Sequence, residues 1–82
     1  MDVLERCNTE LNTLRNLVSG WMKDEEETPL YRDLEQLSDF IGAALDTIDL
    51  LFLEEKLTGA DEDDINDLVI YVDWARNVYR QL

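Results

Sequence analysis

The middle of the chain carries the clearest pattern of apolar and polar positions. Between Thr28 and Leu57, apolar residues recur at alternating steps of four and three, which places them on one side of an α-helix. These positions are Leu30, Leu34, Leu37, Ile41, Ala44, Ile48 and Leu51. Thr28 is suited to capping the start of a helix and Pro29 to its first turn, while Gly59 marks its end. The pattern predicts a long central helix, which needs other segments to cover its apolar side.

The same spacing occurs before and after the central segment. In residues 2–22 the apolar positions are Leu4, Cys7, Leu11, Leu14, Val18 and Trp21. In the last segment they are Ile65, Leu68, Val72, Ala75, Tyr79 and Leu82. Asp61 is suited to capping this last helix, and no alternating strand pattern extends beyond a few residues. We therefore expect a single all-α domain over 1–82, folded as an antiparallel three-helix bundle.

Gly42 lies inside the predicted central helix. Glycine destabilises a helix interior by about 1 kcal/mol relative to alanine, so its presence needs a reason. Two interpretations remain open, a kink in the helix or a close approach of another backbone. A complete break at Gly42 would give four helices instead of three.

Some apolar residues lie away from the predicted core. On the central helix, Leu50 and Leu53 point away from the apolar side, and on the last helix Ile70 and Trp74 form a second patch one turn apart. Exposed apolar patches of this kind usually mark an interface. We expect either a homodimer or a dedicated protein partner that contacts these four residues.

The charge of the chain is strongly negative. The sequence has 20 Asp and Glu residues against 7 Lys and Arg residues, a formal net charge of -13. This balance repels nucleic acids and anionic membranes and attracts basic proteins. The acidic residues expected to contact a partner are Glu35, Asp39, Asp46, Asp49, Asp61, Asp63, Asp64 and Asp67. The simplest alternative is that the acidic residues only keep a helical protein soluble.

The residues that most catalytic sites require are scarce. Histidine is absent and Cys7 is the only cysteine, so the common general base, the nucleophilic triads and ordinary zinc sites are missing. The acidic run at 61–67 departs from a calcium-binding loop, because Asn66 replaces the required glycine and Val72 the bidentate acid. We expect no enzymatic activity, no cofactor and no metal site, and we interpret Cys7 as a small core residue.

The sequence gives no sign of export or of membrane insertion. The first residues lack a basic region followed by an apolar run, so no secretory signal is expected. No uninterrupted apolar run approaches the roughly 20 residues that a membrane span requires. A cytoplasmic location is therefore expected.

Two protein classes share the general character of this chain. Acyl carrier proteins are also small, acidic and helical, but the nearest match to their Asp-Ser-Leu turn is Asp46, Thr47 and Ile48, where threonine replaces the modified serine. This triplet also lies inside the predicted central helix rather than before a helix. The chain is similar in size and charge to small phage-encoded inhibitors of restriction and CRISPR nucleases.

The second resemblance implies recognition without catalysis. Carboxylates held on rigid helices can compete with nucleic-acid phosphates for a basic groove. We therefore expect a small binding protein that inhibits or sequesters a basic, nucleic-acid-binding partner, such as a nuclease. Two alternatives remain open. One is a helical assembly or adaptor subunit that docks through its apolar patch, and the other is an immunity protein or antitoxin.

Overall fold

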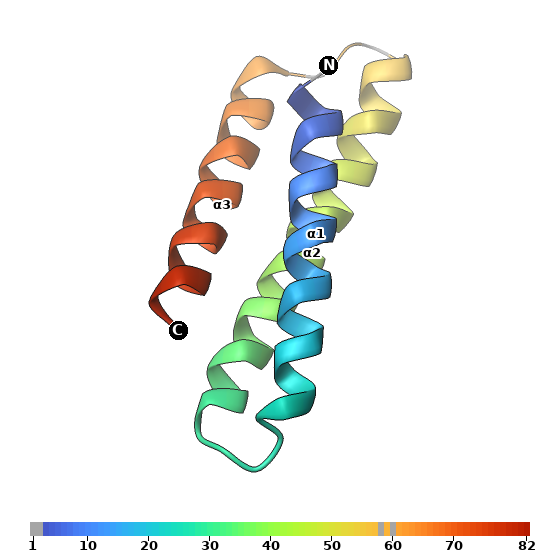
Figure 1. Cartoon of the computed structure of the whole chain (residues 1–82). Helices are drawn as coiled ribbons and strands as arrows, with labels where there is room; N and C mark the ends of the chain where they lie inside the picture. The colour runs from blue at the N-terminus through green and yellow to red at the C-terminus, as the bar shows by residue number, and fades with distance from the viewer. Residues whose placement is uncertain (1–2, 58, 60) are drawn as a thin grey trace.

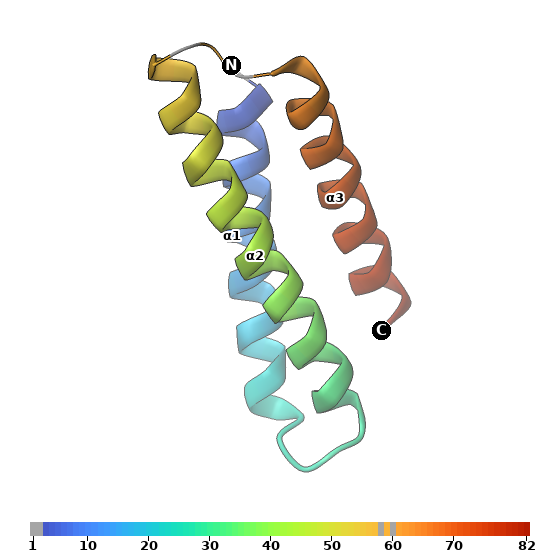
Figure 2. The same ribbon diagram turned by 180° about the vertical axis from the view of Figure 1, so that it is seen from behind.

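The chain folds into three helices. The computed structural model describes residues 3–57, 59 and 61–82, and within them the elements are α1 (Val3–Asp24), α2 (Leu30–Leu57) and α3 (Glu62–Gln81), with no strand. Figures 1 and 2 show the chain descending along α1, returning along α2 and descending again along α3. The molecule is elongated, with extents of 46 × 19 × 18 Å. The prediction of an all-helical bundle of three helices is confirmed.

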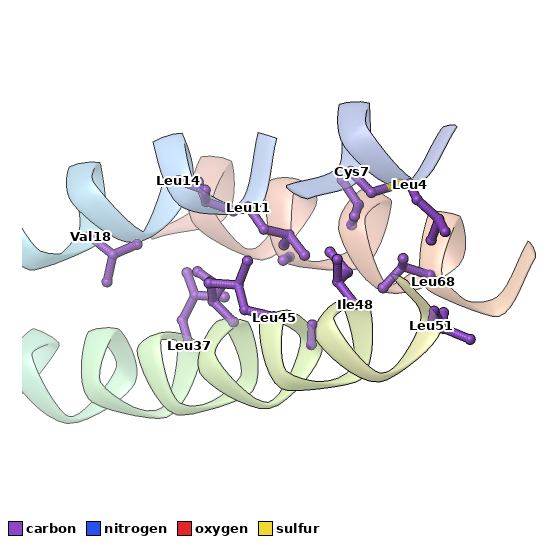
Figure 3. Packing of buried hydrophobic residues seen from close by; sticks show 14 of the residues in the cluster. Leu4, Cys7, Leu11, Leu14, Val18, Leu37, Leu45, Ile48, Leu51 and Leu68 are labelled. Carbon is purple, nitrogen blue, oxygen red and sulfur yellow. The ribbon is translucent and has the colours of Figure 1, made fainter. Parts of the chain in front are cut away.

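The core lies where the apolar sides of the three helices meet. Figure 3 shows side chains of α1 and α2 pointing toward one another, with Leu68 of α3 beside them. The buried residues are Leu4, Cys7, Leu11, Leu14, Val18, Leu34, Leu37, Ile41, Ala44, Leu45, Ile48, Leu51, Leu68, Val72 and Ala75. Of the described residues, none with a polar or charged side chain is buried. The core is therefore entirely apolar and follows the predicted helix periodicity, with each fully buried leucine worth about 1.5 to 3 kcal/mol.

The ends of the helices follow the local sequence with one exception. Asp61 caps α3 as predicted, because its Oδ1 accepts a hydrogen bond from the backbone N–H of Asp63 at 3.1 Å. Gly59 has a φ of 84°, a conformation that favours glycine, and lies just after α2. Thr28 differs from the prediction, because its hydroxyl donates back to Glu25, whose carbonyl oxygen and Oε2 lie 3.0 and 2.7 Å away. The Thr28 side chain is thus bonded within the α1–α2 loop, and its hydroxyl does not cap the first amides of α2.

The central helix is continuous. α2 runs through Gly42 without interruption, so the expected alternative of a break and a fourth helix is wrong. A Cβ atom built on Gly42 would have no atom within 4 Å. No other backbone therefore approaches this glycine, so the interpretation of Gly42 as a point of close backbone approach is also wrong.

None of these three helices, as far as the structure describes them, combines the length and the apolar character that a transmembrane span needs.

Candidate functional site

The predicted acidic residues are all exposed, but they do not all line one groove. Asp46 and Asp49 line a shallow groove of about 330 Å³ between α1 and α2, together with Arg15. Asp64 and Asp67 line a different groove, between α2 and α3. The residues that line neither groove are Glu35, Asp39, Asp61 and Asp63. The acidic side chains are therefore spread over two grooves and the surface outside them.

The groove between α2 and α3 brings acidic and apolar residues together. We call it the α2–α3 groove, and its volume is about 220 Å³. Its lining residues are Thr47, Leu50, Leu51 and Glu54 of α2 and Asp64, Asp67 and Tyr71 of α3. Leu51 is buried and forms the floor, whereas Leu50 is 63% exposed and Tyr71 is 41% exposed. The groove therefore offers apolar contact surface bordered by carboxylates.

An aromatic cluster continues this groove toward the C-terminal end of α3. Phe40 of α2 contacts two rings of α3, with its centroid 5.9 Å from Tyr71 in an edge-to-face arrangement and 4.5 Å from Trp74. Tyr71 belongs to both features, because it lines the groove and touches Phe40. Trp74 remains 50% exposed, and Ile70, one helical turn before it, is 62% exposed. Apolar surface thus extends from Leu50 to Trp74.

The predicted apolar patch is only partly brought together. Leu50 lines the α2–α3 groove and Trp74 belongs to its aromatic cluster, but neither Leu53 nor Ile70 lines the groove. Leu53 is 55% exposed, and its position three residues after Leu50 turns it about 60° around the helix axis. The exposure of all four side chains was thus predicted correctly, and their joint contact with a partner stays a prediction.

Several residues of this surface were not predicted from the sequence. Tyr71 lies three residues before Trp74 and seven after Asp64, a spacing that places all three on one side of α3. Glu54 lies seven residues after Thr47 on α2 in the same way. These helical spacings were available in the sequence as a signal. That these sides of α2 and α3 face each other follows only from the packing of the two helices.

Cys7 lies in the core beside a groove between α1 and α3, which confirms its interpretation as a small core residue. Burial raises the pKa of its thiol, the carboxylate of Glu10 raises it further, and Arg6 opposes them. At the rim of this groove, Arg76 Nη1 lies 3.4 Å from Glu10 Oε2 and 3.8 Å from Asp73 Oδ1. The thiol therefore stays protonated at neutral pH, and a protonated thiol is a poor nucleophile.

The carboxylates of the surface are spread out. Across residues 3–57, 59 and 61–82, no three or more Cys, Asp or Glu side chains come together in a way that could hold a metal ion. The α2–α3 groove can instead form ion pairs with organic cations, such as Lys and Arg side chains, next to an apolar contact.

Comparison with protein-family models, with curated proteins and with solved structures found no match.

Proposed function

We propose that this antiparallel three-helix bundle is a small, acidic, non-catalytic binding protein. It inhibits or sequesters a basic partner protein in the cytoplasm, in particular a nuclease or another nucleic-acid-binding protein. Its carboxylates compete with nucleic-acid phosphates for the partner's basic groove, as expected for inhibitors of the anti-restriction or anti-CRISPR type. The net charge of -13 supports this proposal, because it repels nucleic acids and speeds the encounter with a cationic protein.

The α2–α3 groove is the observation that carries this proposal. Asp64 and Asp67 lie beside the exposed side chain of Leu50 in one groove. Apolar contact contributes affinity at a protein interface, and carboxylates select a partner of opposite charge. A surface whose acidic residues served only solubility would not need exposed leucine, tyrosine and tryptophan beside them.

A pull-down from the native host tests the proposed function. The immobilised protein is incubated with lysate at low salt, and proteins retained on parallel samples are eluted with excess duplex DNA or with a salt step. We expect a defined nucleic-acid-binding protein that both treatments release, because DNA occupies the same basic groove and salt screens the attraction. Retention of only ribosomal and other generic basic proteins, or an interaction insensitive to salt, would contradict the proposal.

The exposed apolar surface supports a second candidate function. Leu50, Ile70 and Trp74 are each at least half exposed, and such surface is expected on a helical assembly or adaptor subunit, on a homodimer, or on an immunity protein or antitoxin. Sedimentation of the wild type and of a Leu53→Gln, Trp74→Gln variant distinguishes the homodimer. A dimer that the two substitutions dissociate supports the second candidate, and a wild-type monomer excludes self-association.

A further inference from the structure

We propose that the α2–α3 groove is the docking site for one amphipathic, basic helix of the partner. The helix places an aliphatic or aromatic side chain against Leu50 and Tyr71 and directs Lys or Arg side chains to Asp64 and Asp67. This inference rests on the proposed function and adds two points to it. It names the part of the surface that is used, and it specifies the chemistry of the segment that binds there.

The direction of the groove suits a helix docked along it. Its lining residues recur at helical spacing on both walls, at 47, 50, 51 and 54 on α2 and at 64, 67 and 71 on α3. The groove therefore runs along the two helix axes. From Asp64 to Tyr71 the α3 wall rises by about 10 Å, which corresponds to about two turns of a docked helix. A helix that lies between two others in this way completes a four-helix arrangement, a common mode of peptide recognition.

The order of charge along the groove sets the order of residues in the ligand. The carboxylates of Asp64 and Asp67 lie near the start of α3, and the apolar surface of Phe40 and Trp74 lies further along it. The docked helix is therefore expected to carry its basic residues at one end and its apolar residues toward the other. Because the N-terminus of a helix carries partial positive charge, that end is favoured beside Asp64.

A second copy of this chain is a poor occupant of the groove. Each copy carries a net charge of -13, and the exposed sides of its helices are rich in carboxylates. Self-association through this groove would bring carboxylates of one copy next to Asp64 and Asp67 of the other. Like charges placed in this way are unfavourable, whereas a basic helix neutralises them.

A peptide titration tests the inference with the full chain. The probe is a fluorescein-labelled peptide of about 18 residues, long enough to form a helix, with leucines on one side and lysines in its N-terminal half. One control peptide has glutamate in place of lysine. A second has the same composition in scrambled order, so that its leucines no longer share a side. Anisotropy gives the Kd at low and moderate salt, and amide chemical shifts of the labelled protein locate the binding surface.

Matched substitutions separate the groove from the rest of the acidic surface. Leu50→Gln is compared with Leu53→Gln, because both leucines are exposed on α2 and only Leu50 lines the groove. Asp67→Asn is compared with Asp63→Asn, which changes the net charge equally on the same helix. We expect Asp67→Asn to weaken binding about two- to fivefold and Leu50→Gln about fivefold or more. The two controls should change the Kd less than about twofold.

The outcomes distinguish the groove from the general electrostatic function. If both variants of each pair weaken peptide binding equally, or if the scrambled peptide binds as tightly as the probe, the groove is not the docking site. A salt-dependent attraction to basic proteins would still stand. Shifts at Leu50 that appear on concentrating the protein alone would identify a second copy as the occupant and would also overturn it. Equal binding of the glutamate peptide, or binding insensitive to salt, would contradict the proposed function itself.

Discussion

Phe40 of α2 and Trp74 of α3 pack against each other outside the core, with ring centroids 4.5 Å apart and planes inclined by 54°. α3 contributes only Leu68, Val72 and Ala75 to the buried core. Partly buried residues of α3, among them Ile65 and Val69, also pack against the core, and the Phe40–Trp74 contact adds to this packing. The same pair adjoins the α2–α3 groove, so the stability of α3 and the shape of the groove are linked.

A double-mutant cycle measures the Phe40–Trp74 contact. Replacing either ring with alanine removes the contact, and we expect a coupling free energy of about 0.5 to 1.5 kcal/mol between Phe40→Ala and Trp74→Ala. Urea denaturation of the wild type, the two single variants and the double variant gives this value. Strictly additive effects would show that the two rings do not stabilise each other.

Leu11 and Leu17 should respond very differently to the same substitution. Leu11 is fully buried in the core, so Leu11→Ala is expected to lower the free energy of unfolding by about 2 to 5 kcal/mol. Leu17, on the same helix, is half exposed, and its change to alanine should cost less than about 1 kcal/mol. Thermal and urea unfolding of both variants provide the measurement. Similar losses would mean that α1 presents a different side to the core.

Gly42 and Gly59 should respond to alanine with opposite signs. At Gly42 the added methyl group meets no atom within 4 Å, and alanine is the better helix former, so we expect a gain of about 0.5 to 1 kcal/mol. At Gly59 the φ of 84° strains any residue with a Cβ, so alanine should destabilise the protein. Comparison of melting temperatures tests both. A loss of stability in Gly42→Ala would show that glycine is required there for a reason other than helix propensity.

The Cys7 thiol should make stability fall at alkaline pH. Its pKa is raised in the folded protein, chiefly by burial, whereas in the unfolded chain it returns toward the ordinary value of 9.0. Below that value both states keep the proton and the stabilisation is complete. As the pH rises through it, the unfolded state loses its proton first, so the free energy of unfolding decreases until the folded pKa is passed.

A Cys7→Ala variant provides the control for this titration. It has no thiol, so the part of the alkaline loss due to Cys7 should be absent when urea midpoints are measured between about pH 8 and pH 10. The wild-type thiol should also react slowly with a disulfide reagent until the protein unfolds. Equal pH profiles for the two proteins would show that burial does not shift this group.

The core could be predicted from the sequence because burial follows the helix period. Residues such as Leu34, Ile41 and Ile48 recur at steps of three and four and are buried as expected. The Asp61 cap depends on a contact two residues away, and it too was predicted correctly. The hydroxyl of Thr28 was not, because a nearby acceptor on Glu25 competes with the amides of α2.

The candidate site could be predicted only as separate residues. The exposure of Leu50 and Asp67 follows from their positions on single helices, but their meeting in one groove depends on how α2 and α3 are rotated against each other. That rotation is set by the fit of side chains between the helices, which periodicity alone does not determine. For the same reason periodicity does not tell which of Leu50 and Leu53 lines the groove.

The wholly external placement of charge has a consequence for ionic strength. Because none of the described charged side chains is buried, added electrolyte reaches them all and weakens the repulsion among the excess carboxylates. Sodium chloride should therefore raise the melting temperature of the free protein while it loosens the complex with a cationic partner. The folded state and the complex would then be most favoured at opposite ends of the same salt gradient.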